Sequence, residues 1–175
     1  GTTLFDRTVW VSDGPEWLRD GTMVVIRRIR MDLDAWDRLS RPDQEAVIGR
    51  TLVDGAPLGG QVGDPLPLTA RAPDGRLVIP PDAHARLAHP STNGGVRIYR
   101  RGVNYDDGRD ATGRPDLGLL FVSFQASVDR QLLPILHRLD RSDALNTWTT
   151  TTASSVFAIL PGFAPDGWIG ERLLA

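Results

Sequence analysis

The stretch that decides the fold is Thr22–Met31, which reads TMVVIRRIRM. Its β-branched residues and its rough alternation of apolar and charged side chains predict a strand with Val25 and Ile29 facing inward. Residues 96–103, residues 117–125 (LGLLFVSFQ) and residues 154–160 (SSVFAIL) have the same character. The sequence therefore predicts four strands.

A helical segment in two pieces follows the first predicted strand. Asp34 can cap a short helix that carries Trp36, because a carboxylate accepts hydrogen bonds from the free amides of a first turn. Helical spacing resumes at Pro42 and Gly49 stops it, as is usual for these two residue types. We therefore expect a helix that is broken in two.

A second helical segment, with a leucine stripe over residues 132–139, precedes the last predicted strand. Pro134 lies in its early turns and is expected to bend it. The order strand, helix, strand, strand, helix, strand is that of an α+β ferredoxin-like (βαββαβ) domain with a four-stranded antiparallel sheet. Helices cover only one face of such a sheet, so the other face needs a second domain, a partner subunit or a large ligand.

Composition limits the classes of protein that fit. With 175 residues and 41% hydrophobic content, the chain is expected to form a single domain over residues 1–175. The net charge is -2 and the 20 basic residues, all arginine, are scattered, so a nucleic-acid partner is not expected. No apolar run is long enough to span a membrane. The absence of cysteine excludes disulfides, thiolate ligation of haem and iron–sulfur clusters.

The segment from residue 51 to residue 95 is a long loop rich in Pro, Gly, Asp and Ala, and such loops are usually functional or disordered. It contains His84, and a neutral imidazole can hold a haem iron. Arg100 follows on a predicted strand, and an arginine that keeps its proton can polarise peroxide. His89 and His137 rank below His84 as ligands, and a slip of one residue in strand register would exchange Arg100 for Arg101.

Several longer phrases surround these residues and are far more specific together than singly. They are VVIRRIRM followed by Trp36 and Asp37, GAPLG from Gly55, DAHARLAHP from Asp82, IYRRGVNY from Ile98, DLGLLFVSFQ from Asp116, and SSVFAILPG near the end. Together they resemble the C-terminal half of dye-decolourising-type (DyP) haem peroxidases of the bacterial deferrochelatase-like subgroup. The resemblance implies one ferredoxin-like half of a dimeric α/β-barrel type peroxidase.

The resemblance implies haem b (iron protoporphyrin IX) as the cofactor, with His84 as the proximal iron ligand and Arg100 as the catalytic arginine on the distal side. The other cofactor-binding residues would be two that line the distal pocket and two propionate contacts: Leu119, Phe121, Arg86 and Arg101. A proximal histidine also donates its second ring N–H to an acceptor. Asp143 is a candidate for that acceptor.

Members of the family carry a GxxDG motif whose aspartate moves a proton on the distal side, often followed by GT. The chain begins with Gly1 and Thr2, so we expect that aspartate and an N-terminal ferredoxin-like half to lie upstream. One hypothesis is a separate chain that carries this half and accompanies the present one. The other is a stand-alone protein that forms a homo-oligomer.

The function expected from these residues is a haem-dependent peroxidase that reduces hydrogen peroxide and oxidises dyes, phenols or similar small aromatic one-electron donors. Tyr99, Tyr105, Trp148 and Trp168 could carry oxidising equivalents to bulky donors, although packing is the simpler role for most of them. The alternatives are a haem-binding or haem-handling module without turnover and a structural domain that needs no haem. The resemblance favours export by the twin-arginine route.

Overall fold

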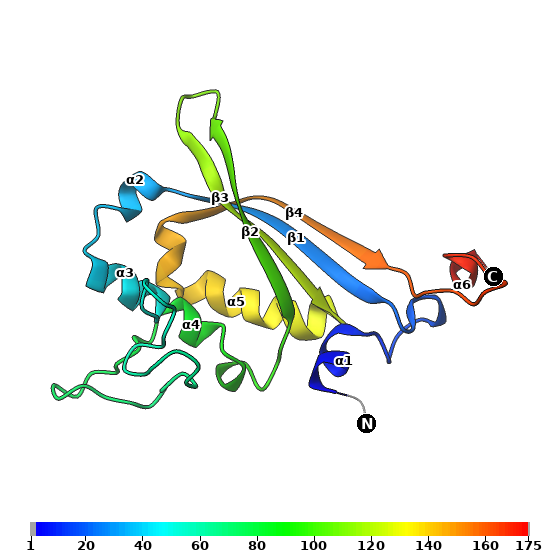
Figure 1. The fold of residues 1–175 in the computed structure, drawn as a ribbon, viewed down its shortest axis with the longest axis horizontal. Coiled ribbons are helices and arrows are strands. Elements are labelled where there is room, and N and C mark those ends of the chain that lie inside the picture. The colour runs from blue at the N-terminus through cyan, green and yellow to red at the C-terminus, as the bar shows by residue number, and fades with distance from the viewer. Residues whose placement is uncertain (1–2, 175) are drawn as a thin grey trace. The chain divides into compact units, whose positions relative to one another are not determined.

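The computed structural model describes residues 3–174, and its centre is a four-stranded sheet (Figure 1). The strands are β1 (Thr22–Met31), β2 (Tyr99–Arg109), β3 (Pro115–Gln125) and β4 (Thr149–Ile159), and they lie in the order β2-β3-β1-β4. Strand β3 is antiparallel to both β1 and β2. This is the strand order of the predicted ferredoxin-like fold, which is confirmed.

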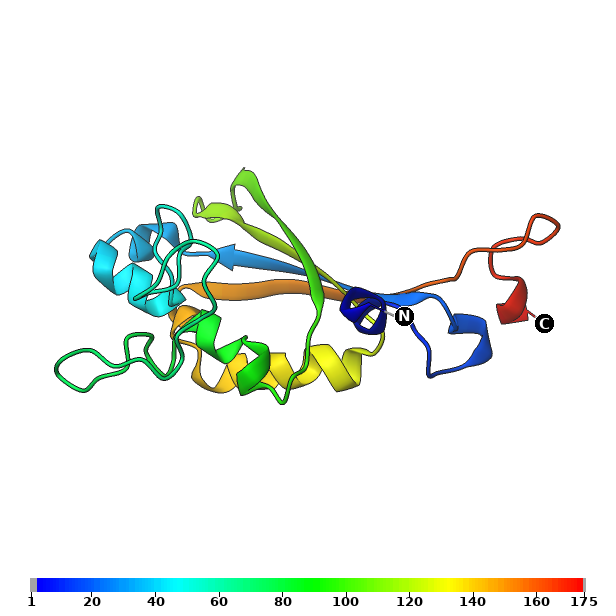
Figure 2. The same cartoon turned by 60° about the horizontal axis from the view of Figure 1, so that its bottom comes forward.

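Short helices and helical turns connect the strands. The α-helices are α1 (Leu4–Val9), α2 (Leu33–Trp36), α3 (Arg41–Ile48), α4 (His84–Leu87), α5 (Leu133–Ser142) and α6 (Glu171–Leu174). The remaining turns are η1 (Glu16–Leu18), η2 (Pro90–Thr92), η3 (Val128–Leu132), which is π-helical, and η4 (Ala144–Thr147). Figure 2 shows α6 beside the segment that holds η1.

The first predicted strand is confirmed over its whole length, and the predicted break of the first helix separates α2 from α3. The cap of α2 differs from the prediction, because the carboxylate of Asp32 rather than that of Asp34 accepts a hydrogen bond, from the amide of Ala35, at 3.0 Å. Gly49 ends α3 at a φ of 83°, a left-handed conformation that favours glycine.

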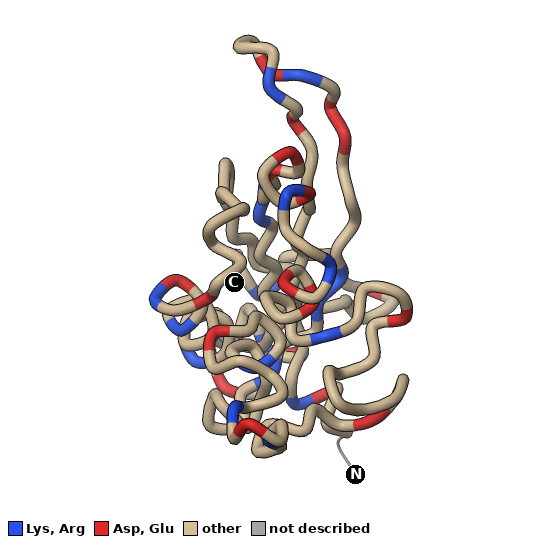
Figure 3. Tube along the Cα trace, turned by 90° about the vertical axis from the view of Figure 1, so that its left-hand side faces the viewer, with Lys and Arg blue, Asp and Glu red and all other residues tan. Residues whose placement is uncertain are grey.

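Strands β2 and β3 are longer than predicted. Their pairing continues through Tyr105 opposite Gly118 and Asp106 opposite Leu117 into the polar connection that the sequence suggested was a loop. Strand β1 stops pairing with β3 at Arg30 opposite Gly118, so the end of the β2–β3 hairpin reaches past it. Positive and negative residues are mixed along this hairpin (Figure 3).

Two compact units divide the chain. The sheet unit comprises the chain up to Met31, Val96–Pro134 and the chain from Thr150 onward, and the loop unit comprises Asp32–Gly95 with Ile135–Thr149. The most buried apolar side chains of the sheet unit include Val25 and Leu132, which are 3% and 1% exposed. The loop unit has its own core, which includes Trp36, Ile79, Ala83, Leu87 and Ile135. Both units therefore contribute buried apolar side chains.

Much of the sheet is exposed along its outer strands. Nine of the eleven residues of β2 and ten of the eleven residues of β4 are exposed. Large apolar side chains are among the exposed ones: Val103 of β2 is 59% exposed, and Val156 and Phe157 of β4 are 53% and 54% exposed. Ile26 of the inner strand β1 is 37% exposed. Val25 is buried as predicted, whereas Ile29 is half-buried. No helix within residues 3–174 is both long and apolar enough to cross a membrane.

Candidate haem site

His84 begins the four-residue helix α4 in the loop unit, and its imidazole is held from one side. The Nδ1 atom lies 2.6 Å from Oδ2 of Asp143, and the Asp143 side chain is only 3% exposed. A buried carboxylate beside an imidazole nitrogen fixes the proton on that nitrogen and orients the ring. This bond joins residues that are 59 positions apart in the sequence, and it places the candidate acceptor Asp143 where a proximal histidine needs one.

Asp143 is itself fixed by its neighbours. Its Oδ1 accepts a hydrogen bond from the amide of Leu145 at 3.0 Å, which caps the turn η4, while its own amide donates to the carbonyl of Leu139 at 2.9 Å. The amide of Ala144 donates to the carbonyl of Asp82 at 3.1 Å and ties η4 to the loop just before His84. The carboxylate therefore cannot move far from the imidazole.

The second ring nitrogen of His84 is left for a ligand. Nε2 makes no hydrogen bond to any residue in the described part of the chain, and the side chain is 31% exposed. An imidazole with one nitrogen hydrogen-bonded to a carboxylate and the other bare is the arrangement in which histidine binds a metal or a haem iron. The chemistry of these donors fits the cofactor implied by the sequence.

Arg100 lies on β2 in the sheet unit, opposite Ser123 of β3. Leu119 and Phe121 precede Ser123 at alternate positions of the same strand, and alternate residues share a face. The register therefore puts Arg100, Leu119 and Phe121 on one face of the sheet. Arg100 is exposed and makes no hydrogen bond or ion pair with the residues described.

The next residue, Arg101, points to the opposite face because it pairs with Val122. Its Nε donates to the hydroxyl of Tyr99 at 3.0 Å. The register thus separates the two arginines that the sequence could not tell apart, and it places Arg100 with the predicted pocket residues.

Arg86, the other predicted propionate contact, holds the long loop together. Its Nε donates to the carbonyls of Ile79 and Pro80 at 3.1 and 3.0 Å, and its Nη2 donates to the carbonyls of Leu68 and Ile79 at 2.7 and 2.8 Å. These bonds explain how a loop without regular structure keeps one conformation around α4. A contact between Arg86 and a propionate stays a prediction.

The rival histidines have different surroundings. Nδ1 of His89 lies 2.6 Å from the hydroxyl of Ser91, within the turn η2. His137 is exposed on α5. The His84 ring, by contrast, lies beside the buried carboxylate of Asp143.

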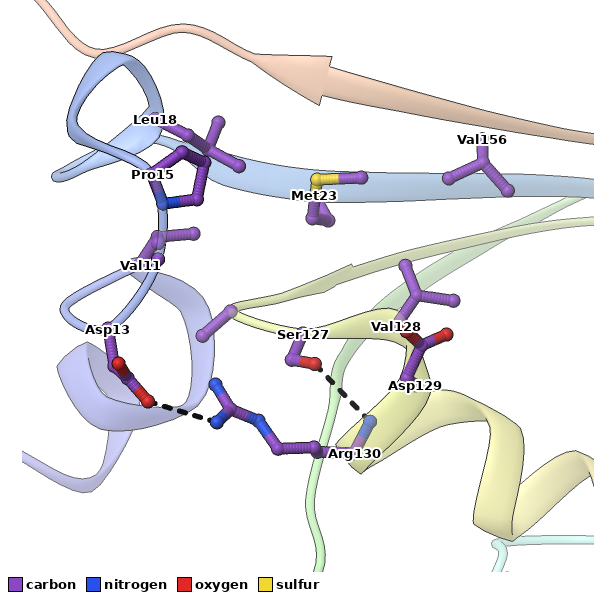
Figure 4. Close-up of a pocket in the computed structure, with 12 residues that line it drawn as sticks. Val11, Asp13, Pro15, Leu18, Met23, Ser127, Val128, Asp129, Arg130 and Val156 are labelled. Atoms are coloured by element: carbon purple, nitrogen blue, oxygen red, sulfur yellow. Dashed lines mark hydrogen bonds and ion pairs between the residues drawn. The ribbon is translucent and has the colours of Figure 1, made fainter.

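The sheet unit also has an open hollow of about 450 Å³, drawn in Figure 4. Arg130 lies beside it, where its Nη1 donates to Asp13 at 3.0 Å and its amide donates to the Ser127 hydroxyl at 3.3 Å. Met23 and Val156 contribute apolar walls. None of the residues predicted to bind haem or to act on peroxide lines this hollow, so it is not part of the candidate haem site.

Sequence reasoning overlooked one polar residue on the face that holds Arg100. Ser123 is 0% exposed, and its hydroxyl has no hydrogen-bond partner among the described residues. The signal was available in LGLLFVSFQ, where a hydroxyl residue takes an alternate position in a row of apolar side chains.

Comparison with known proteins decides the family. The family model for the C-terminal part of Dyp-type peroxidases matches residues 2–164. The chain belongs to the Dyp-type peroxidase family. The phrases that suggested this family from the sequence are therefore confirmed as a resemblance to its C-terminal domain.

Curated relatives in the Dyp-type family are longer than this chain. A dye-decolorizing peroxidase of Thermobifida fusca (strain YX) is 41% identical over 98% of this chain and 41% of its own length. A deferrochelatase of Yersinia pestis bv. Antiqua (strain Nepal516) is 38% identical over 98% of this chain and 40% of its own length. The chain thus spans about two fifths of the length of these curated relatives.

Solved structures of Dyp-type peroxidases have the same fold over nearly all of this chain. Ferric DtpA of Streptomyces lividans matches with a TM-score of 0.91 and 46% identity, covering 99% of this chain and 48% of that chain. A DyP-type peroxidase of Cellulomonas bogoriensis matches with a TM-score of 0.91 and 46% identity, covering 97% of this chain and 48% of that chain. The sheet and the loop together are therefore the family's C-terminal domain.

Proposed function

We propose that this chain is the haem-binding half of a peroxidase that reduces hydrogen peroxide and oxidises dyes, phenols or similar one-electron donors. The observation that carries the proposal is the His84 ring, whose Nδ1 is held by the buried carboxylate of Asp143 while Nε2 has no partner among the described residues. Membership of a family of haem peroxidases supports the same conclusion.

In this proposal Nε2 of His84 would hold the iron of haem b, and Asp143 would keep the proton on Nδ1. A carboxylate at 2.6 Å makes the imidazole a stronger electron donor. When bound, haem supplies the electron transfer that peroxide reduction requires. The protein contributes the ligand and its orientation.

Arg100 serves the distal side. Its guanidinium would stabilise the negative charge that develops on the departing oxygen as the O–O bond breaks. Leu119 and Phe121 share its face of the sheet and exclude water, which strengthens that electrostatic interaction. Arg86 and Arg101 are proposed propionate contacts, with Arg101 needing a change of side-chain direction.

A second polypeptide segment completes the site in this proposal. The chain covers about two fifths of its curated relatives, and apolar residues of the sheet such as Ile26 and Val103 are exposed. We infer that an N-terminal half, on the same chain or on a separate one, covers this face, which is opposite the one that holds Arg100. A segment of that half on the Arg100 side would bring the aspartate that moves the peroxide proton. A homo-oligomer is the alternative cover.

Replacement of the proposed iron ligand gives the direct test. We expect His84→Ala to abolish tight haem binding or to change the axial ligation, measured by haem titration and by the position of the Soret band. His137→Ala, which changes an exposed histidine, is the matched control and should leave both unchanged. Unaltered ligation in His84→Ala would move the ligand to another residue.

Replacement of the distal arginine tests the peroxidase reaction itself. We expect Arg100→Leu to slow the Soret change on mixing with peroxide by about 100- to 1000-fold, the range found when one preorganised donor to a developing negative charge is removed. Haem content should change little. Arg138→Leu, at an exposed position of α5, is the control, and equal rates for wild type and Arg100→Leu would remove the role assigned to Arg100.

A haem-handling module without turnover is the second candidate, and the deferrochelatases among the curated relatives favour it. Such a protein would bind haem through His84 but show no rapid Soret change with peroxide. The rate of the Soret change after rapid mixing with peroxide, measured by stopped flow, therefore separates the two candidate functions.

We also propose an extracytoplasmic location, reached by twin-arginine export. This proposal depends on the family resemblance. Fractionation of cells that make the full-length protein would test it, and retention in the cytoplasm would reject it.

A further inference from the structure

Ser123 is a fully buried polar residue in the middle of β3. Its side chain is 0% exposed, and Oγ has no hydrogen-bond partner within residues 3–174. A buried hydroxyl without a partner is unfavourable, and each such group in a folded protein calls for an explanation. The surroundings of Ser123 on the sheet suggest what its partner is.

Across the sheet, Ser123 has one apolar and one charged neighbour. Val25 of β1 lies opposite on one side and Arg100 of β2 lies opposite on the other. Residues directly opposite each other in an antiparallel pair point to the same face with their Cβ atoms about 4.5–5.5 Å apart. Val25 offers no polar atom, so the guanidinium of Arg100 is the polar group nearest in register.

Arg100 is likewise without a partner among the described residues, and it is exposed. Its guanidinium has five N–H donors, and a serine oxygen has two acceptor positions. The side chain has several rotatable bonds, so without an anchor it samples many orientations. A donor and an acceptor that both lack partners thus lie on neighbouring strands.

We propose that Ser123 is a positioning residue for Arg100, whose guanidinium donates a hydrogen bond to the Ser123 hydroxyl when the haem pocket is occupied. The inference rests on the function proposed for Arg100. It adds that the distal arginine is fixed from within the sheet, by a residue that does not itself contact peroxide.

The other buried polar residue of this row does not fit the role. Oε1 of Gln125 also lacks a partner among the described residues, but its Nε2 donates to the carbonyl of Met23 at 3.0 Å. The pairing of β2 with β3 begins at Tyr99 opposite Phe124. No residue of β2 therefore lies opposite Gln125, whereas Ser123 faces Arg100 directly.

The test uses the haem-loaded, full-length protein and the substitution Ser123→Ala. We expect the rate of the peroxide-induced Soret change to fall about 3- to 10-fold, the range of a single hydrogen bond. The affinity of the ferric protein for fluoride, an anion that the guanidinium would stabilise, should fall by a similar factor. Ser155→Ala, at an exposed position of β4, is the matched control.

A double-mutant cycle separates positioning from a general structural effect. In the Arg100→Leu background, Ser123→Ala should change neither the rate nor the fluoride affinity further, because the group being positioned is gone. In the protein that retains Arg100, Ser123→Thr keeps the hydroxyl and should therefore have the rate and the fluoride affinity of the wild type. Ser123→Cys keeps the volume with only a weak acceptor and should behave like alanine, so the test survives if threonine does not fit.

The outcomes distinguish this inference from the proposed function. A loss that is the same in both backgrounds, or no loss in Ser123→Ala, would overturn the role of Ser123 while leaving that of Arg100 intact. Equal rates for wild type and Arg100→Leu would instead reject the proposed role of Arg100, and the role of Ser123 with it.

Discussion

The Asp143 side chain is only 3% exposed, yet its two carboxylate oxygens contact two different parts of the loop unit. One lies beside the imidazole of His84 and the other accepts the amide of Leu145. A buried polar group in such a place is stabilised by these specific hydrogen bonds. Replacing Asp143 should therefore change how the His84 imidazole is held while leaving the imidazole itself in the protein.

At the scale of the residue, we expect Asp143→Asn to weaken haem binding about 10- to 100-fold, the usual range for the hydrogen-bond partner of a metal-ligating histidine. An amide keeps the shape of the carboxylate but not its charge. Haem titration measures the change, and Asp140→Asn, an exposed position of α5, is the control. Equal affinities in the two variants would argue against a role for Asp143.

The sequence predicted His84 because the phrase around it is specific, but it could only suggest Asp143. The two residues are 59 positions apart, and nothing in local periodicity reports a contact over that distance. Ser123 was missed for a different reason. Alternation shows which residues share a face, but it does not show that a hydroxyl in that row lacks a partner.

At the scale of the element, the β2–β3 hairpin is longer than its polar sequence suggested because charges hold it together. Arg28 of β1 makes ion pairs with Asp107 at 2.6 Å and Asp116 at 2.9 Å, and its guanidinium carbon lies 4.0 Å from the centre of the Tyr105 ring. Such cross-strand pairs need three strands in register. The order of the elements could be predicted from periodicity, whereas the positions at which β2 ends and β3 begins could not.

The tip of this hairpin should respond to acid. The pKa of Asp110 is lowered to about 2, first by the Thr112 hydroxyl and then by the amide of Arg114. In an unfolded chain the pKa of Asp is about 3.9. The carboxylate therefore stabilises the tip fully above that value, and the stabilisation is lost as the pH falls towards 2. Amide hydrogen exchange at the tip should speed up over this interval.

Asp110→Asn provides the comparison for that measurement. The variant lacks the titrating group, so exchange at its tip should be faster at neutral pH and depend less on acid after correction for intrinsic rates. The same acid response in both proteins would assign the effect to another group.

Gly118 marks the place where β3 leaves β1. A Cβ atom at this position would clash with the carbonyl oxygen of Ile29, a contact that the backbone cannot accept without moving. We expect Gly118→Ala to lower the free energy of unfolding by at least about 1 to 3 kcal/mol. Denaturant unfolding measures this, and Gly162→Ala, where the added atom would meet nothing within 4 Å, should be close to neutral.

At the scale of the whole molecule, the exposed apolar residues of the sheet, including Ile26 and Val103, require a cover. We expect an N-terminal half supplied as a separate polypeptide to bind and to raise the unfolding temperature by about 5 °C or more, since each kcal/mol shifts it by about 2–4 °C for chains of this size. Calorimetry with and without the added half makes the measurement. A temperature that does not change with the concentration of the added half would contradict this arrangement.

Strand β4 lies at an edge of the sheet, and its sequence TTTTASSVFAI contains no charge, proline or glycine. Native proteins usually guard such edges with one of these residues, because an unguarded edge offers its backbone amides and carbonyls to any extended peptide. Copies of this chain would add strands to one another along this border wherever nothing covers it. Cells that make this chain would therefore deposit a larger share of it in inclusion bodies when this edge is left uncovered.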